Sequence, residues 1–134
     1  MARTLTVDTI TLDPANHEFV LYFVEDGPWP ENPLAMKESM VRIQGRIFDA
    51  IDAIVNGIVA AKYPESSGMA FRIQVDSPSG VPDALSQIVT VTRQYVVENN
   101  EYRTSIANSH HVQGLRIVTG HEMGRFSRKA AKGL

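Results

Sequence analysis

The sequence contains no cysteine, and this absence excludes several kinds of chemistry together. Disulfide bonds, thiolate metal sites and cysteine nucleophiles all need a thiol. Without them, the fold must be stabilised by packing and by polar contacts. A chain without disulfides also suits a reducing compartment, so we expect a cytoplasmic protein.

Long apolar runs are missing as well. Thr and Asp interrupt residues 1–11 at every second or third position, so this segment does not resemble a secretory signal sequence. The most apolar stretch, residues 43–61, contains Arg46, Asp49 and Asp52, each of which is costly inside a bilayer. We therefore expect neither export by such a signal nor a membrane-spanning helix.

Motifs for phosphate binding and nucleophilic catalysis are also absent. The sequence has neither a Gly-x-Gly-x-x-Gly run nor a Gly-Lys-Ser/Thr element, which excludes nucleotide binding through those loops. No Gly-x-Ser-x-Gly turn surrounds any serine. We therefore expect no cofactor, and these patterns do not indicate an enzyme.

Charge is unevenly distributed along the chain. All 15 acidic residues lie at or before Glu122, whereas the last basic residues, Arg125, Arg128, Lys129 and Lys132, lie beyond it. A mildly acidic body does not fit a duplex nucleic-acid reader, which needs a clustered basic face. We expect no nucleic-acid partner, and we interpret residues 121–134 as a basic, flexible tail.

Length and composition indicate one folded domain, which we place at residues 1–120. With 134 residues, of which 43% are hydrophobic and 21% charged, the chain can build a single hydrophobic core. Apolar and polar side chains alternate over residues 5–12, and residues 13–16 follow as a turn. Residues 18–25 are apolar on both faces, which predicts an internal strand paired with the first as a hairpin.

Further along, one strand and two helices are predicted. Asn32 can cap a helix that begins at Pro33 and stops at residues 56–57, with apolar residues at intervals of three and four. Alternation over Met69–Asp76 predicts a strand. A second helix is predicted from residues 81–83 onward, and the alternative is a strand over residues 88–97. Residues 102–107 are predicted to be a strand in either case, and Val112–Thr119 a weaker one.

Together these elements predict an α+β fold in two layers. The expected order is ββαβαβ, with a mixed sheet of four to five strands, an N-terminal hairpin and two helices packed on one face. The apolar arc of the first helix covers nearly half of its circumference, which is more than contact with one sheet needs.

Several distinctive motifs lie within the first 80 residues. They are Val7-Asp8-x-Ile10-x-Leu12-Asp13, Glu18-x-Val20-Leu21, a loop with Trp29, and a long helix that ends at Asn56-Gly57 before Lys62-Tyr63-Pro64-Glu65. This pattern resembles a family of small bacterial domains of unknown function. The motifs are structural, so the resemblance implies no activity.

The metal-capable residues gather near the C-terminus. His110, His111, His121 and Glu122 combine imidazole and carboxylate groups that could hold zinc or another divalent cation. Their spacing fits no defined motif, because His121-Glu122 lacks the second histidine of a zinc-protease helix. Solvated loop histidines are the simpler interpretation, and a small metal-assisted hydrolase is one alternative function.

Other acidic residues are weaker candidates for a site. Asp8, Asp26 and Asp76 lie at expected strand ends, where open α/β sheets often bind ligands, although aspartate also commonly ends strands. Asp49 and Asp52 lie three residues apart on the polar face of the first helix, and we interpret them as solvated surface.

The excess apolar surface between Asn32 and Gly57 predicts a partner. Trp29 in its proline-rich loop, with Met36, Met40 and Phe48 on the helix, forms the predicted interface, although Trp29 could instead anchor its loop to the core. The sequence is interpreted as a non-catalytic protein-interaction or structural module that self-associates as a homodimer. A regulatory or immunity-like protein that binds another protein is the remaining alternative.

Overall fold

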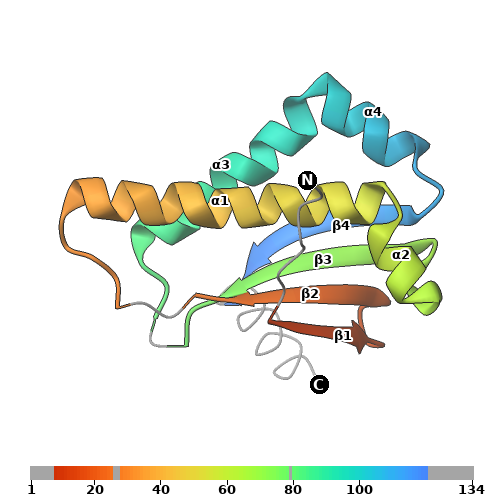
Figure 1. Cartoon of the computed structure of the whole chain (residues 1–134), viewed down its shortest axis with the longest axis horizontal. Helices are drawn as coiled ribbons and strands as arrows, with labels where there is room; N and C mark the ends of the chain where they lie inside the picture. Colours follow the sequence, from red (N-terminus) through yellow and green to blue (C-terminus); the bar gives the residue numbers. More distant parts are fainter. Residues whose placement is uncertain (1–7, 26–27, 79, 121–134) are drawn as a thin grey trace, which may run out of the picture.

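The computed structural model describes residues 8–25, 28–78 and 80–120, and these form a four-stranded mixed sheet with four helices (Figure 1). The strands are β1 (Thr9–Asp13), β2 (Glu18–Val24), β3 (Met69–Asp76) and β4 (Val112–Thr119). They lie in the order β1-β2-β3-β4. The hairpin partners β1 and β2 are antiparallel, whereas β2, β3 and β4 run parallel.

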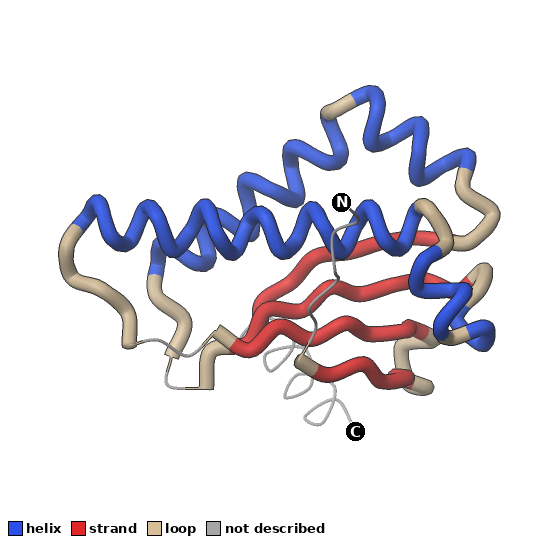
Figure 2. The backbone as a smooth tube through the Cα atoms, viewed as in Figure 1, coloured by secondary structure: helices blue, strands red, loops and turns tan. Residues whose placement is uncertain are grey.

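The helices connect the parallel strands. α1 (Pro33–Val55), α2 (Ile58–Lys62) and the 3₁₀ helix η1 (Pro64–Ser66) lie between β2 and β3, and α3 (Asp83–Glu98) and α4 (Asn100–Asn108) lie between β3 and β4. Figure 2 shows α1, α3 and α4 on one side of the sheet. The α+β class, the mixed sheet and the N-terminal hairpin are therefore confirmed. Within the described ranges, no helix is both long enough and apolar enough to cross a bilayer.

The prediction of a strand at residues 102–107 is wrong, because this segment is part of α4. The side chain of Asn99 caps the helix by accepting a hydrogen bond from the Tyr102 amide at 3.1 Å. Tyr102 and Ile106, one turn apart, both pack against the core. The order ββαβαβ with two helices is corrected accordingly, and the alternative strand at residues 88–97 is helix α3.

The start and end of α1 follow from its sequence. The Asn32 carboxamide oxygen accepts hydrogen bonds from the Leu34 and Ala35 amides at 2.8 and 3.2 Å, and Pro33 occupies the first turn, where no amide donor is needed. After Val55 the chain turns at Gly57, whose φ of 81° lies in the left-handed region that favours glycine. The predicted helix over these residues is confirmed.

The core lies between the sheet and the helices. Alternate strand residues supply its lower layer, and buried α1 residues supply its upper layer, including Phe19, Leu21, Phe23, Phe71, Ile73, Val75, Ile43, Ile47, Ile51 and Ile54. Leu85, Val89 and Val96 of α3 join the same cluster. Because side chains alternate along a strand, the remaining strand residues point to the face without described helices.

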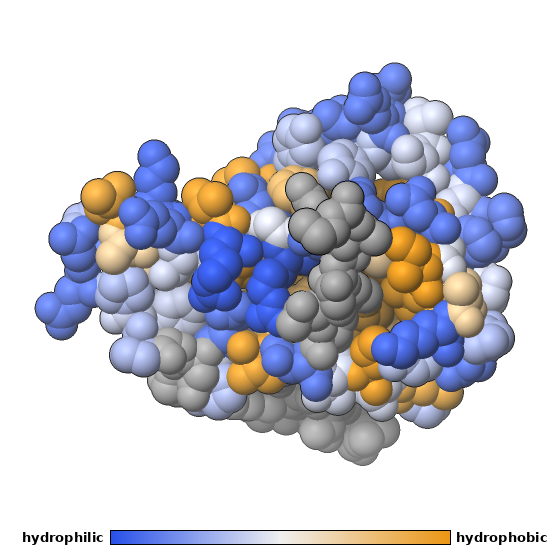
Figure 3. Space-filling view, in the orientation of Figure 1, coloured by the Kyte–Doolittle hydropathy of each residue, from blue (hydrophilic) through white to orange (hydrophobic). Residues whose placement is uncertain are grey.

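Helices α3 and α4 cover much of the wide apolar arc of α1. Phe48 of α1 packs against Tyr95 of α3 and Tyr102 of α4, with ring centroids 5.7 and 5.5 Å apart. Much of the surface that predicted a partner is therefore enclosed within one chain. Apolar surface remains at the outer side of α1 and α3, and Figure 3 shows hydrophobic side chains reaching the surface over α1.

Candidate functional site

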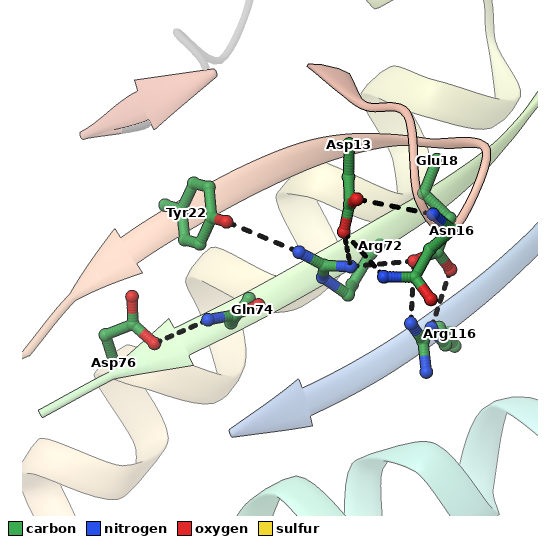
Figure 4. A network of polar contacts seen from close by, with 8 residues as sticks. All are labelled: Asp13, Asn16, Glu18, Tyr22, Arg72, Gln74, Asp76 and Arg116. Carbon is green, nitrogen blue, oxygen red and sulfur yellow. Dashed lines mark hydrogen bonds and ion pairs between the residues drawn. The ribbon is translucent and has the colours of Figure 1, made fainter. Parts of the chain in front are cut away.

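The sheet face away from the helices, here called the open face, carries a charged network (Figure 4). The side chains of the open face come from alternate residues of all four strands. They are Asp13 of β1, Glu18, Val20 and Tyr22 of β2, Arg72, Gln74 and Asp76 of β3, and Arg116 and Val118 of β4. No described helix lies on this face in Figures 1 and 2.

Arg72 is the centre of this network. Its Nη1 donates to Asp13 Oδ2 at 2.7 Å and to Glu18 Oε1 at 2.8 Å, and its Nη2 donates to the Tyr22 hydroxyl at 3.3 Å. The guanidinium is almost fully buried, with 4% of the side chain exposed. A buried arginine needs such partners, because an uncompensated charge in the interior is costly.

Glu18 holds two arginines together. The strand register places Arg72 directly opposite Arg116, where like charges repel. Arg116 donates from Nε to Glu18 Oε2 at 2.6 Å and from Nη2 to Glu18 Oε1 at 2.7 Å. The carboxylate thus accepts from both guanidinium groups and compensates their repulsion.

The network also shifts the pKa of Asp13 and of Arg72. Hydrogen bonds from the Asn16 side chain and from Arg72 lower the pKa of Asp13 from 3.8 to about 2. Burial lowers the pKa of Arg72, but hydrogen bonds from its guanidinium to Asp13, Tyr22 and Glu18 outweigh burial and leave it raised. Both groups therefore stay charged at neutral pH.

Two buried polar atoms of the open face have no hydrogen-bond partner. They are Nε of Arg72, a donor, and Oε1 of Gln74, an acceptor two residues along β3 on the same face. Arg72 and Gln74 are each less than one tenth exposed to solvent. The Gln74 amide nitrogen is satisfied, since it donates to Asp76 Oδ1 at 2.8 Å. Unpaired buried polar atoms are uncommon in folded proteins and call for an explanation.

Asp76 lies at the carboxyl end of β3, beside a shallow hollow of about 330 Å³. Ser77, Pro78, Gly80, Val81 and Gly120 complete its lining. A side chain at position 120 would collide with the Asp76 carboxylate, so this carboxylate packs directly against the Gly120 backbone. The sheet order follows the chain order without reversal, so this edge lacks the crevice where open α/β sheets usually bind ligands.

A second charged group ties the hairpin to α1. Arg42 donates twice to Glu25, at 2.8 and 2.9 Å, and Arg46 donates to Glu25 Oε1 at 2.6 Å. Burial raises the pKa of Glu25, but the hydrogen bonds from Arg42 and Arg46 outweigh it and leave the pKa below its usual value. Asp8, a sequence candidate, accepts from the Val24 amide at 2.7 Å, which is a structural role. Asp26 lies outside the described residues.

A groove of about 410 Å³ separates the N-terminal half of α1 from α3. Apolar side chains of both helices line it, from Pro33, Met36 and Met40 on α1 and from Ala84, Ile88 and Val91 on α3. Lys37 and Gln87 add a charged and a polar group to its walls. We call this feature the helical groove.

The structure brings together two of the four predicted interface residues. Met36 and Met40 both line the helical groove. Phe48 instead belongs to the aromatic cluster farther along α1. Trp29 is half-buried against the core and its Nε1 donates to Ser77 Oγ at 3.2 Å, which matches the alternative role as an anchor for its loop.

The predicted metal ligands are only partly described. The rings of His110 and His111 lie 4.2 Å apart, and His111 packs against Gly57. His121 and Glu122 lie outside the described residues. Among residues 8–25, 28–78 and 80–120, no three His, Asp or Glu side chains are close enough to hold a metal ion. The metal site therefore stays a prediction.

Sequence reasoning missed the network on the open face. Its signal is present, because Glu18, Arg72 and Arg116 are charged residues within strongly strand-forming segments. Their proximity depends on the register between β2, β3 and β4, which a single sequence does not specify.

Comparisons with family models, with curated proteins and with solved structures find no match to this chain.

Proposed function

We propose that this chain is a non-catalytic protein-interaction module that forms a homodimer through the helical groove. The observation that carries the proposal is the apolar lining contributed by two helices, with Val91 at 55% exposure. Contiguous exposed apolar surface commonly marks a protein contact. Pairing two copies through this surface would remove it from water.

The charges beside the groove favour a second copy of the chain as the occupant. Lys37 lines the groove on α1, and Asp83 is the first residue of α3, one helical turn before the lining residue Gln87. In a twofold dimer, residue i of one copy meets residue j of the other, and the same contact forms again by symmetry. A Lys37–Asp83 contact between copies would therefore form twice.

The methionines of the groove suit this role. Met36 is half-buried and Met40 is nearly buried, so they form its floor rather than a solvated rim. Methionine side chains are flexible and polarizable, and they adapt to a partner surface at little conformational strain. They support a dimer contact without requiring any reacting group.

Sedimentation velocity with Val91→Lys tests the proposal. We expect the unaltered protein to be dimeric at micromolar concentration and the variant to be monomeric, because the new ammonium would be buried at the contact. Val97→Lys is the matched control, since Val97 lies on the same helix, is 63% exposed and is not part of the groove lining. It should remain dimeric.

The opposite results are equally informative. A strictly monomeric protein at high micromolar concentration would contradict the homodimer. A Val91→Lys variant that stays dimeric would show that another surface makes the contact. Loss of binding to a different protein in Val91→Lys alone, with no homodimer, would instead support the regulatory alternative.

A further inference from the structure

The methionines are the only sulfur-containing residues of the chain. The sequence has no cysteine and five methionines, so methionine thioethers are its only sulfur groups open to oxidation. Met36, Met40 and Met69 belong to the described residues, whereas Met1 and Met123 do not. Two of the three described methionines, Met36 and Met40, line the helical groove.

Met36 and Met40 differ in their access to solvent. They lie four residues apart on α1, which places both side chains on one face of the helix. Met40 is 7% exposed and belongs to the hydrophobic core, whereas Met36 is half-buried and packs against that core from outside. An oxidant in solution therefore reaches the thioether of Met36 more readily than that of Met40.

The surroundings of Met36 give its oxidation a consequence for the dimer. Ala84, Ile88 and Val91 of α3 form the apolar wall of the groove across from α1. A thioether is apolar, whereas the sulfoxide formed from it is polar. In the proposed dimer the sulfoxide oxygen would be buried among apolar side chains, which is costly, while in a separated copy water would hydrate it. Oxidation of Met36 therefore favours the separated copies.

We propose that Met36 is a site of reversible oxidation by peroxides, and that its sulfoxide separates the two copies of the dimer. This inference rests on the proposed function, because it assigns a regulation to the same groove. The Met36 sulfur lone pair attacks one oxygen of hydrogen peroxide, and an S–O bond forms as the O–O bond breaks. The other oxygen takes up the proton of the attacked oxygen and leaves as water. The sulfur loses two electrons and the peroxide gains them.

Met69 is the internal control for this site. Like Met36, it is partly buried and packs against the core, but it does not line the groove. It lies at the start of β3, which Figure 1 shows at the opposite end of the molecule from the start of α1. Because the dimer covers the groove, oxidation of Met36 should slow as the protein concentration rises, whereas oxidation of Met69 should not change.

Treatment of the full-length protein with hydrogen peroxide tests the proposal. Peptide mass spectrometry measures the sulfoxide at Met36 and at Met69, and sedimentation velocity measures the dimer in the same samples. We expect oxidation of Met36 in both copies to weaken association about a hundredfold, because a buried unsatisfied polar group costs roughly tenfold at each of two symmetric contacts. Incubation with methionine sulfoxide reductases for both sulfoxide epimers should restore the dimer.

Three variants separate the effect of Met36 from that of other residues. Met36→Leu keeps an apolar side chain of similar size without sulfur, so it should stay dimeric after peroxide treatment. Met36→Gln introduces a polar amide at the same place and should be monomeric without peroxide. Met69→Leu is the matched control and should dissociate on peroxide treatment as the unaltered protein does. Unchanged circular dichroism shows that each variant is folded.

The possible failures are distinguishable. Untreated protein that is already monomeric would contradict the homodimer and, with it, this inference. A dimer that persists although mass spectrometry finds Met36 fully oxidised would overturn the inference and leave the homodimer standing. Dissociation of peroxide-treated Met36→Leu would assign the effect to another residue and would also overturn the inference.

Discussion

At the scale of single residues, the most consequential side chain is Glu18. Its carboxylate accepts hydrogen bonds from two arginines that face each other across adjacent strands. Replacing buried ion pairs by apolar groups can be neutral, but removing one partner leaves charge buried without compensation. The cost of losing Glu18 is therefore set mainly by the arginines that remain.

Glu18→Gln should lower the free energy of unfolding by about 3 kcal/mol, because Arg72 would then be compensated by Asp13 alone while it faces Arg116. Urea denaturation at neutral pH measures this change. Glu65→Gln on the exposed surface of η1 is the control and should stay within about 0.5 kcal/mol of the unaltered protein. Equal effects of the two substitutions would show that the network does not stabilise the fold.

Asp13 makes stability depend on acid pH. Its pKa is about 2 in the folded protein and 3.8 ordinarily, so the unfolded chain binds the proton more readily. The stabilisation is complete above about pH 4 and is lost as the pH falls towards 2. Unfolding free energies measured between pH 2 and 5 should fall less steeply for Asp13→Asn. Identical slopes for both proteins would contradict the assigned role of Asp13.

At the scale of elements, the sequence predicted those whose local signals agree. The cap at Asn32, the proline that follows and the apolar spacing all indicate α1, and the alternation over Met69–Asp76 indicates β3. The strand prediction for residues 102–107 failed because aromatic and β-branched residues favour a strand, whereas the Asn99 cap and the packing of Tyr102 favour a helix. Tertiary packing decided the outcome, and it is not visible in a short window of sequence.

The role of Gly57 at the end of α1 can be tested by comparing it with Gly68, which precedes β3. Gly57 and Gly68 both have positive φ, at 81° and 77°, so alanine at either should cost roughly 1–2 kcal/mol. A Cβ at Gly57 would also lie 2.6 Å from His111 Nε2, whereas Gly68 has open space. Gly57→Ala should therefore lower the free energy of unfolding by at least about 1 kcal/mol more than Gly68→Ala.

The histidine contact separates the two causes. In a His111→Ala background, the extra cost of Gly57→Ala over Gly68→Ala should disappear, because only the backbone strain remains. Denaturant titration of all these variants gives the comparison. An extra cost that persists without the imidazole would mean that His111 does not restrict position 57.

At the scale of the whole molecule, the sequence predicted the α+β class but not which surfaces meet. The apolar excess of α1 was visible, yet α3 and α4 cover much of it, and Phe48 lies in that covered part. Of the predicted interface residues, Met36 and Met40 line one groove, whereas Arg72 and Glu18 of the charged network were not predicted from the sequence. The covering of α1 depends on where α3 and α4 are placed, and the charged network depends on the register between distant strands.

The proposed dimer predicts a reciprocal effect of charge. Lys37→Glu and Asp83→Lys should each weaken association about tenfold, because an exposed ion pair contributes roughly 0.7 kcal/mol and the contact forms twice. The double variant should recover most of the affinity. Sedimentation equilibrium at low ionic strength measures the dimer dissociation constants of the two single variants and of the double variant. Additive losses in the double variant would place Lys37 and Asp83 apart in the dimer.

The strand order also bears on how the chain assembles during synthesis. Each strand pairs with its immediate predecessor in the sequence, so the sheet can grow outward from the N-terminal hairpin as the ribosome releases the polypeptide. When β3 arrives, Arg72 already finds Asp13 and Glu18 in place. Arg116 arrives last with β4 and donates to both oxygens of Glu18, so no cation is buried before its counter-ion exists.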